Sequence, residues 1–202
     1  MFSWGDSRTA FTDAAGWFAR TAALVGDRWD RPGLGEWDVR ALVGHTSRAL
    51  LTVETYLARP AAAVDIASAP DYFRATSAAA GPAVAARGRD AGAALGSDPA
   101  AAVAEIAARV LALVDGQDGT EVVATIAGGM RLADYLPTRT FELAVHTADV
   151  ATALGVPLDV PVTAAAQAFH IVADLALTSG LAGPLLLAAT GRPGLPAGFS
   201  VL

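Results

Sequence analysis

The stretch from Arg139 to Val150, which reads RTFELAVHTADV, constrains the fold more than any other part of the chain. In a helix of about 3.6 residues per turn, Glu142, His146 and Asp149 lie along one line. Apolar residues, among them Val145, lie on both sides of that line. A helix that is apolar nearly all round is typical of a buried position. Since an unpaired buried charge is unfavourable, the polar side chains of this helix need partners.

A divalent metal ion would satisfy the carboxylate and the imidazole together. Glu142 and His146 are four residues apart, so a helix places one oxygen and one nitrogen ligand a single turn apart. The pair alone is a weak motif, because this spacing occurs by chance in many helices. A third candidate is His45, on the apolar face of a helix predicted from Asp38 to Arg59. Two imidazoles and one carboxylate from two helices leave a position open for water or substrate, as catalytic metal sites do.

Each histidine also has a purely structural interpretation, because a lone histidine on an apolar helix face is more often a core residue than a ligand. The joint placement of His45, His146 and Glu142 favours a metal site for these three residues. His170 has only Asp174 at helical spacing. We therefore expect His170 to lie in the core or at the surface, outside the site.

Asp149 is the candidate catalytic residue, one turn beyond His146. Its carboxylate can orient a ligand imidazole from behind, handle a proton, or touch the substrate. An ion pair with a nearby arginine such as Arg139 or Arg48 is an equally good interpretation. The sequence leaves these alternatives open.

Composition narrows the class of protein. The 202 residues suffice for one domain, or for one domain and a small appendage, and 53% of them are hydrophobic. There is no cysteine, so disulfides, thiolate metal ligands and a cysteine nucleophile are all excluded. The formal charge is −6, which argues against nucleic acid and anionic membranes as partners. All 14 basic residues are arginine, a bias typical of a GC-rich genome.

No targeting or membrane segment is expected. The first residues, MFSWGD, lack a basic region followed by an apolar one, so we expect no signal peptide. The apolar run from Leu181 to Ala189 is interrupted by Gly183 and Pro184, and it is shorter than the ~20 residues that span a bilayer. A cytoplasmic protein is the resulting expectation.

The periodicity predicts an all-α fold with at most one minor β-hairpin. Helices are expected over residues 6–25, 38–59, 71–95, 100–114, 137–155, 160–180 and 183–190. The helix over 71–95 is weakened by Gly81–Pro82, Gly88 and Gly92, and Pro137 is placed in the first turn of its helix. Residues 121–126 are β-branched, and Gly128–Gly129 is expected to turn a hairpin or carry a loop.

Two segments carry a resemblance to a known family. GEWDVRALVGH, ending at His45, and RTFELAVHTADV, from Arg139 to Val150, are about a hundred residues apart. Together they resemble the mycothiol-dependent maleylpyruvate isomerase N-terminal domain family, whose members are DinB-like metal-binding four-helix bundles. The resemblance runs from the first helix to about Gly155. It implies a divalent metal, commonly zinc, with nickel or iron as alternatives, on His45, Glu142 and His146.

The end of the chain bears on function. Residues 185–192, LLLAATGR, resemble the ending of short actinobacterial members that are described only as metal-binding proteins. The isomerases proper have a further C-terminal domain, and the residues after Gly155 are too few for all of it. We therefore expect residues 1–202 to form a single metal-binding domain, with 160–202 as a helical extension packed on it, and a homodimer is a further expectation.

Three functions follow from this resemblance and from the predicted site. The first is a metal-dependent enzyme that activates a low-molecular-weight thiol, mycothiol in an actinobacterial host, for isomerisation or S-transfer. The second is a metal-dependent hydrolase, in which the metal activates water. The third is a non-catalytic metal-binding or ligand-binding bundle.

Overall fold

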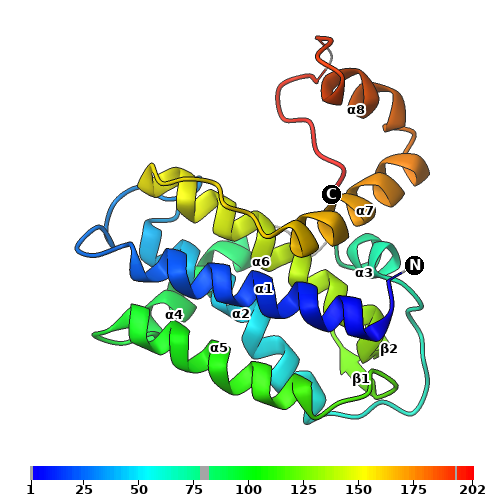
Figure 1. The fold of residues 1–202 in the computed structure, drawn as a ribbon, viewed down its shortest axis with the longest axis horizontal. Helices are drawn as coiled ribbons and strands as arrows, with labels where there is room; N and C mark the ends of the chain where they lie inside the picture. Colours follow the sequence, from blue (N-terminus) through cyan, green and yellow to red (C-terminus); the bar gives the residue numbers. More distant parts are fainter. Residues whose placement is uncertain (1, 78–81, 194) are drawn as a thin grey trace.

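The computed structural model describes residues 2–77, 82–193 and 195–202. Within these ranges the fold is mostly α-helical, with eight helices and one antiparallel hairpin (Figure 1). The prediction of an all-α fold with a minor hairpin is therefore confirmed. The elements are α1 (Trp4–Ala23), α2 (Val39–Leu57), α3 (Ala69–Thr76), α4 (Pro82–Ala94), α5 (Pro99–Asp115), β1 (Val122–Thr125), β2 (Gly128–Arg131), α6 (Leu132–Leu154), α7 (Val162–Thr178) and α8 (Ala182–Ala189).

Four of these helices surround the core. α5 and α6 each pack against both α1 and α2. The largest fully buried side chains include Phe11, Phe18, Leu42, Leu50 and Tyr135, which come from α1, α2 and α6. Burying each such side chain stabilises the fold by about 1.5–3 kcal/mol. The helix that carries Glu142 and His146 therefore lies against the centre of the molecule.

Capping residues set where two of the core helices begin. The Asp38 carboxylate accepts a hydrogen bond from the Ala41 amide at 2.7 Å, and Asp98 accepts one from Ala101 at 3.1 Å. Each bond satisfies an amide that the first turn of a helix leaves free. Asp38 thus caps α2, the helix that presents His45, as predicted.

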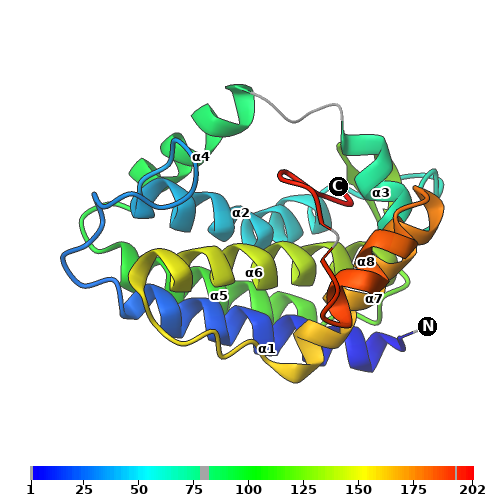
Figure 2. The same cartoon turned by 90° about the horizontal axis from the view of Figure 1, so that it is seen from above.

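α4 crosses α2 at very short range (Figure 2). A Cβ atom on Gly44 would lie 2.1 Å from the backbone nitrogen of Gly92, so only glycine fits at this crossing. The prediction of one helix over 71–95 is wrong: α3 and α4 are separate helices, and Gly81 lies outside the described residues. Gly92, which would weaken a lone helix, serves here to bring α4 onto α2.

The hairpin differs from the prediction in the place of its turn. Thr125 pairs with Gly128, so residues 126–127 form the turn, and Gly128 and Gly129 belong to β2. A Cβ atom on Gly129 would lie 1.9 Å from the Ala63 carbonyl oxygen, and the Ile66 amide bonds to the Gly129 carbonyl at 3.0 Å. The glycines therefore accommodate a neighbouring segment of backbone, and they do not make the turn.

α6 begins five residues earlier than Pro137, so the prediction of Pro137 in its first turn is wrong. Leu132, Tyr135 and Leu136 are fully buried, and this burial stabilises the first turns. An interior proline removes one backbone hydrogen bond and disfavours a helix by about 3 kcal/mol. The packing of the first turns offsets that penalty. The helix ends at Gly155, as predicted.

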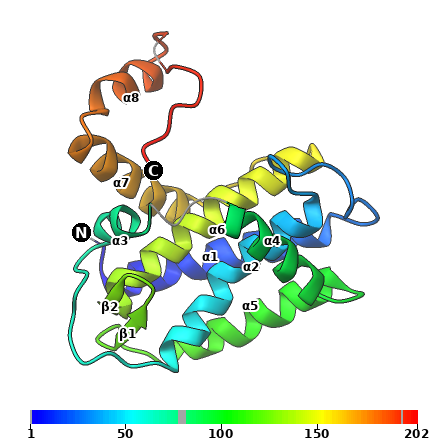
Figure 3. The same ribbon diagram turned by 180° about the vertical axis from the view of Figure 1, so that it is seen from behind.

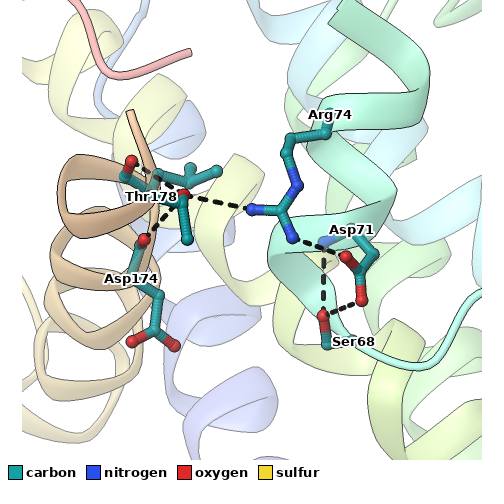
Figure 4. Close-up of polar contacts among 6 residues, drawn as sticks. Ser68, Asp71, Arg74, Asp174 and Thr178 are labelled. Carbon is teal, nitrogen blue, oxygen red and sulfur yellow. Dashed lines mark hydrogen bonds and ion pairs between the residues drawn. The ribbon is translucent and has the colours of Figure 1, made fainter. Parts of the chain in front are cut away.

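α3 and α7 meet at one end of the molecule, near the hairpin and far from the loop over residues 27–37 (Figure 3). Ser68 caps α3 and donates a hydrogen bond to Asp71 at 2.6 Å (Figure 4). Arg74 pairs with Asp71 and donates to the Thr178 hydroxyl at 3.2 Å, so it joins α3 to α7 (Figure 4). This polar contact holds α3 where its aromatic residues face α6.

The C-terminal segment extends from the body of the molecule (Figure 1). α7 packs against α1 and α6, and Gln167 donates to the Ser7 hydroxyl at 3.0 Å. α8 buries no side chain and packs against α7. In the part of the chain that the structure describes, no helix has both the length and the apolarity needed to cross a membrane.

Candidate metal centre

The structure brings three of the predicted site residues together where α2 and α6 face each other. His45 comes from α2, and Glu142 and His146 come from α6. Each offers one possible ligand atom, and these atoms all lie within 4.8 Å of one another. Nε2 of His146 is 3.2 Å from Oε2 of Glu142, while the His45 and His146 rings are nearly perpendicular, with centroids 4.8 Å apart. It is the only such cluster of three ligand-type residues among those that the structure describes.

These side chains fit a bound cation better than a closed hydrogen-bond network. The side chains of His146 and Glu142 are 19% and 25% exposed, so water reaches them only in part. Nδ1 of His45 is fully buried and has no hydrogen-bond partner among the described residues. A buried polar atom without a partner is unfavourable, and coordination of a metal ion by this nitrogen would supply the missing partner. Two nitrogens and one carboxylate oxygen are also ligands that zinc accepts.

The protonation states suit metal binding at two of the three ligands. Burial, and then the neighbouring His146, lower the pKa of His45 to about 4, so this imidazole is neutral at pH 7. Burial alone would raise the pKa of Glu142, but its hydrogen bond with His146 and the charge of Arg139 lower it to about 2. Burial would also lower the pKa of His146, but its hydrogen bonds with Asp149 and Glu142 raise it to about 9. Without metal, therefore, His146 is protonated at both ring nitrogens at pH 7, whereas His45 is neutral.

Asp149 lies behind His146. Its Oδ2 is 3.0 Å from Nδ1 of His146, on the opposite side of the ring from Glu142. Neither Arg139 nor Arg48 forms an ion pair with Asp149 within the described ranges. The geometry is the one in which a carboxylate fixes the tautomer and orientation of a ligand imidazole.

The residues around Glu142 and His146 are not buried on every side. Val145 is 38% exposed, so the prediction of a helix buried all round is wrong for this position. Phe141, by contrast, is buried and packs edge-on against Phe73 of α3 at 5.0 Å. α6 therefore has one face in the core and one edge at the surface, with the polar line between them.

Trp37 also contributes to the centre, a role that the sequence analysis did not predict. Its ring lies over His45 with centroids 4.5 Å apart and an interplanar angle of 32°. Its indole nitrogen donates to the Ala85 carbonyl of α4 at 3.0 Å, and a Cβ atom on Gly88 would lie 2.7 Å from the ring. The indole is thus locked between α4 and the imidazole that it covers. The sequence motif contains Trp37 eight residues before His45, but this spacing alone does not predict stacking.

A pocket of about 460 Å³ opens beside the centre and includes His45 and Glu142 in its wall. α3 contributes Tyr72 and Phe73, and the hairpin turn contributes Ile126. The remaining described wall residues are Arg48, Ala49, Thr52, Tyr56, Thr76, Val84, Arg87 and Arg139. A small molecule in this pocket would therefore be next to the candidate ligands.

His170 lies elsewhere. Its side chain is 52% exposed, with Nε2 3.5 Å from Asp174 and its ring edge-on to Phe2. His170 therefore lies at the surface, which is one of the two positions expected for it.

Comparison with known proteins identifies the family. The model of the mycothiol maleylpyruvate isomerase N-terminal domain matches residues 11–151, which include every residue of the candidate centre. No curated protein and no solved structure gives a significant match. The matched segment begins within α1, contains α2 to α5 and the hairpin, and ends in the last turn of α6, before α7. The chain belongs to the mycothiol maleylpyruvate isomerase N-terminal domain family.

Proposed function

We propose that this protein binds a divalent metal ion through His45, Glu142 and His146. The observation that carries the proposal is the convergence of these three side chains within 4.8 Å at the contact of α2 and α6. Zinc suits the two imidazoles and one carboxylate, and nickel and iron are alternatives with the same ligands. The ligands come from two helices, and the pocket beside them leaves room for a further ligand.

We propose further that the metal serves an enzyme that uses a low-molecular-weight thiol of the mycothiol type. Membership of the family supports a mycothiol-related role. A bound metal supplies a Lewis acid that lowers the pKa of a thiol at its open position. The chain has no cysteine of its own, so the thiol has to come from a small molecule.

In this proposal the surrounding residues orient the ligands and exclude water. Asp149 accepts the Nδ1 proton of His146, which directs Nε2 toward Glu142 and the centre. In this role Asp149 is a positioning residue, because its carboxylate contacts the His146 ring nitrogen that faces away from Glu142 and is not among the described wall residues of the pocket. Trp37 covers one face of His45 and restricts the rotation of the imidazole. The sequence-based expectations of a cytoplasmic location, of a homodimer and of no nucleic-acid partner remain predictions.

The test is S-conjugation by the zinc-loaded protein with mycothiol and 1-chloro-2,4-dinitrobenzene. A carbon–sulfur bond forms, chloride leaves, and the thiol proton passes to the buffer. The proposal expects a rate that depends on both zinc and thiol, and that is lost in His45→Ala but kept in His170→Ala. The same preparations are assayed for hydrolysis of p-nitrophenyl acetate without thiol.

The outcomes separate the three candidate functions. Zinc-dependent ester hydrolysis that thiol does not affect would favour the hydrolase. Zinc binding without either reaction, across several thiols and electrophiles, would favour the non-catalytic bundle.

A further inference from the structure

One face of α7 is apolar and exposed. The helix packs on α1 and α6, and its buried face includes Ala164, Ile171 and Leu175. The other face carries apolar residues spaced by three or four positions, and all of them are exposed: Val162, Ala166, Phe169, Ala173 and Leu177. In a helix of about 3.6 residues per turn, such positions form one stripe along the helix. These five residues are called the α7 stripe below.

The large side chains of the α7 stripe lie almost entirely in water. Val162 is 84% exposed, Phe169 is 71% exposed and Leu177 is 66% exposed. A single exposed apolar residue needs no explanation, whereas a continuous apolar patch is typical of an interaction surface. α7 belongs to the segment that extends from the body of the molecule, so another molecule can reach this face (Figure 1).

The order of residues along the α7 stripe favours a second copy of the chain as the partner. Large and small side chains alternate, and the order of sizes is the same when it is read backwards. If two α7 helices pack antiparallel about a two-fold axis beside Phe169, Val162 of one copy faces Leu177 of the other. The same axis places Ala166 of one copy opposite Ala173 of the other. A two-fold contact uses one patch twice and therefore requires a self-complementary surface of this kind.

Charge does not oppose this contact. The α7 stripe has no charged residue, and α7 as a whole has no arginine or lysine. The ionisable side chains of α7 are His170 and Asp174, which lie on one flank of the stripe with Nε2 and Oδ2 3.5 Å apart. Depletion of charge is a feature of the central part of protein interfaces.

The exposed area indicates how strong such a contact can be. The α7 stripe presents roughly 500 Å² per copy, since one fully exposed aromatic side chain alone presents about 150–250 Å². Two stripes together would bury at most about 1,000 Å², which exceeds the ~800 Å² limit of most crystal-packing contacts but not the ~1,600 Å² of a standard interface. The area therefore suits a specific dimer with a dissociation constant in the micromolar range.

We propose that the α7 stripe is a homodimer interface in which the α7 helices of two copies pack antiparallel. The inference goes beyond the proposed function, because no residue of the stripe belongs to the candidate metal centre or to the described wall of its pocket. It can therefore be tested on the protein with or without metal.

The first experiment is sedimentation equilibrium of the full chain from about 1 to 200 µM, a range that brackets a micromolar dissociation constant. The wild type should be monomeric at the low end and largely dimeric at the high end. Phe169→Asp should weaken association about tenfold or more, because it places a carboxylate in an apolar contact. Leu186→Asp is the matched control: it adds the same charge at a position of α8 that is 65% exposed and outside the stripe. It should associate like the wild type.

Circular dichroism of each variant checks that the helices are retained. A wild type that stays monomeric over the whole range would overturn the proposal. Equal loss of association in Leu186→Asp and Phe169→Asp would overturn the assignment to the α7 stripe. A monomeric wild type that binds phosphatidylcholine vesicles through Phe169 would identify a membrane, and not a second copy, as the partner.

A second experiment tests the antiparallel orientation. The chain has no cysteine, so Ala166→Cys and Ala173→Cys each introduce a single thiol. Copper phenanthroline in air should link an equimolar mixture of the two variants into a covalent dimer. Each variant alone should link poorly, because identical positions would lie about 10 Å apart along the helix axes, beyond the ~7 Å that a disulfide spans between Cα atoms. Linking of Ala166→Cys alone as readily as the mixture, or no linking of the mixture, would contradict the antiparallel arrangement.

Discussion

His146 contacts a carboxylate at each of its two ring nitrogens, Asp149 at Nδ1 and Glu142 at Nε2. These contacts outweigh burial and raise its pKa to about 9, whereas burial lowers that of His45 to about 4. Asp149 and Glu142 therefore stabilise a proton on His146 in the metal-free protein. Their negative charges would also stabilise a metal cation bound at Nε2. The proton and the metal compete for Nε2.

This competition predicts a pH dependence of metal binding. At pH 7 His45 is neutral, Glu142 is ionised and His146 carries a proton, so uptake of one metal ion should release about one proton from His146. Zinc affinity should rise about tenfold per pH unit from pH 5 to pH 8 and level off near pH 9. Titrations in buffers of different ionisation enthalpy measure the proton count. An affinity that stays flat over this range would contradict the assignment of His146 as a ligand.

Asp149→Asn tests the positioning of His146. The amide oxygen can still accept a hydrogen bond from Nδ1 but has no negative charge to strengthen it, so zinc affinity should fall about 10-fold to 100-fold, while saturating zinc still fills the site. Asp174→Asn is the matched control, because Asp174 contacts the exposed His170. Competition with a chromogenic chelator gives both affinities. Equal affinities in the two variants would show that Asp149 does not position the ligand.

Helical spacing was sufficient to predict that Glu142, His146 and Asp149 would be aligned, whereas the approach of His45 from α2 depends on helix packing. Glu142, His146 and Asp149 follow one another within a single helix, so their alignment depends only on local geometry. Trp37 and Arg139 were not predicted to have their observed partners. Trp37 lies over His45 because α4 covers it, and Arg139 lies between tyrosines of α3 and α6. Such contacts depend on how separate helices pack, which local periodicity does not contain.

At the scale of elements, the crossing of α2 and α4 shapes the pocket. Gly44 and Gly92 let the two backbones approach closely. α4 then places Arg87 in the wall of the pocket and Ala85 where its carbonyl accepts the Trp37 hydrogen bond. Sequence analysis treated Gly88 and Gly92 as weak points in a helix. The tertiary contact reverses that interpretation, because the absence of a side chain is what allows the close approach.

Gly44→Ala should therefore destabilise the protein. The added Cβ would lie 2.1 Å from the Gly92 nitrogen, which forces α2 and α4 apart at an expected cost of about 1–3 kcal/mol. Alanine favours helix over glycine by roughly 1 kcal/mol, so the clash must outweigh a local gain. Gly183→Ala, where no atom lies within 4 Å, is the control and should be neutral or stabilising. Urea unfolding of both variants measures the difference, and a stabilised Gly44→Ala would refute this account of the crossing.

The other errors at this scale have the same origin. Pro137 is a strong local signal for the start of a helix, but buried Leu132 and Tyr135 extend α6 in front of it. Gly128 and Gly129 resemble turn residues, but they lie in β2, where a side chain at either position would collide with the segment that contains Ala63 and Asp65. Caps such as Asp38 were predicted correctly, because a cap acts within its own first turn.

For the whole molecule, a metal centre between α2 and α6 links binding to folding. These helices are distant in sequence and meet only in the native state, so an ion held by both should stabilise that state alone. At zinc concentrations about 100-fold above the Kd, the free energy of unfolding should increase by about 2.7 kcal/mol. Thermal unfolding with and without zinc measures the effect. The increase should vanish in His45→Ala and persist in His170→Ala, and an equal increase in both would indicate binding elsewhere.

The C-terminal segment, residues 160–202, lies outside the candidate metal centre. α7 packs on the helices of the core, whereas α8 exposes Leu186 and Leu187 and buries nothing. The family match also ends before α7. The assignment of residues 160–202 to an extension of a single domain remains a prediction.

The most direct test of the central claim is the metal content of the purified protein. Wild type, His146→Ala and His170→Ala are prepared without chelator and analysed for divalent metals by mass spectrometry, before and after incubation with zinc. We expect about one equivalent in the wild type and in His170→Ala, and little in His146→Ala, because a three-ligand site loses most of its affinity with one ligand. The same metal content in all three proteins, or none in the wild type even after incubation with zinc, would contradict the account and leave Glu142 and His146 as a partly buried ion pair.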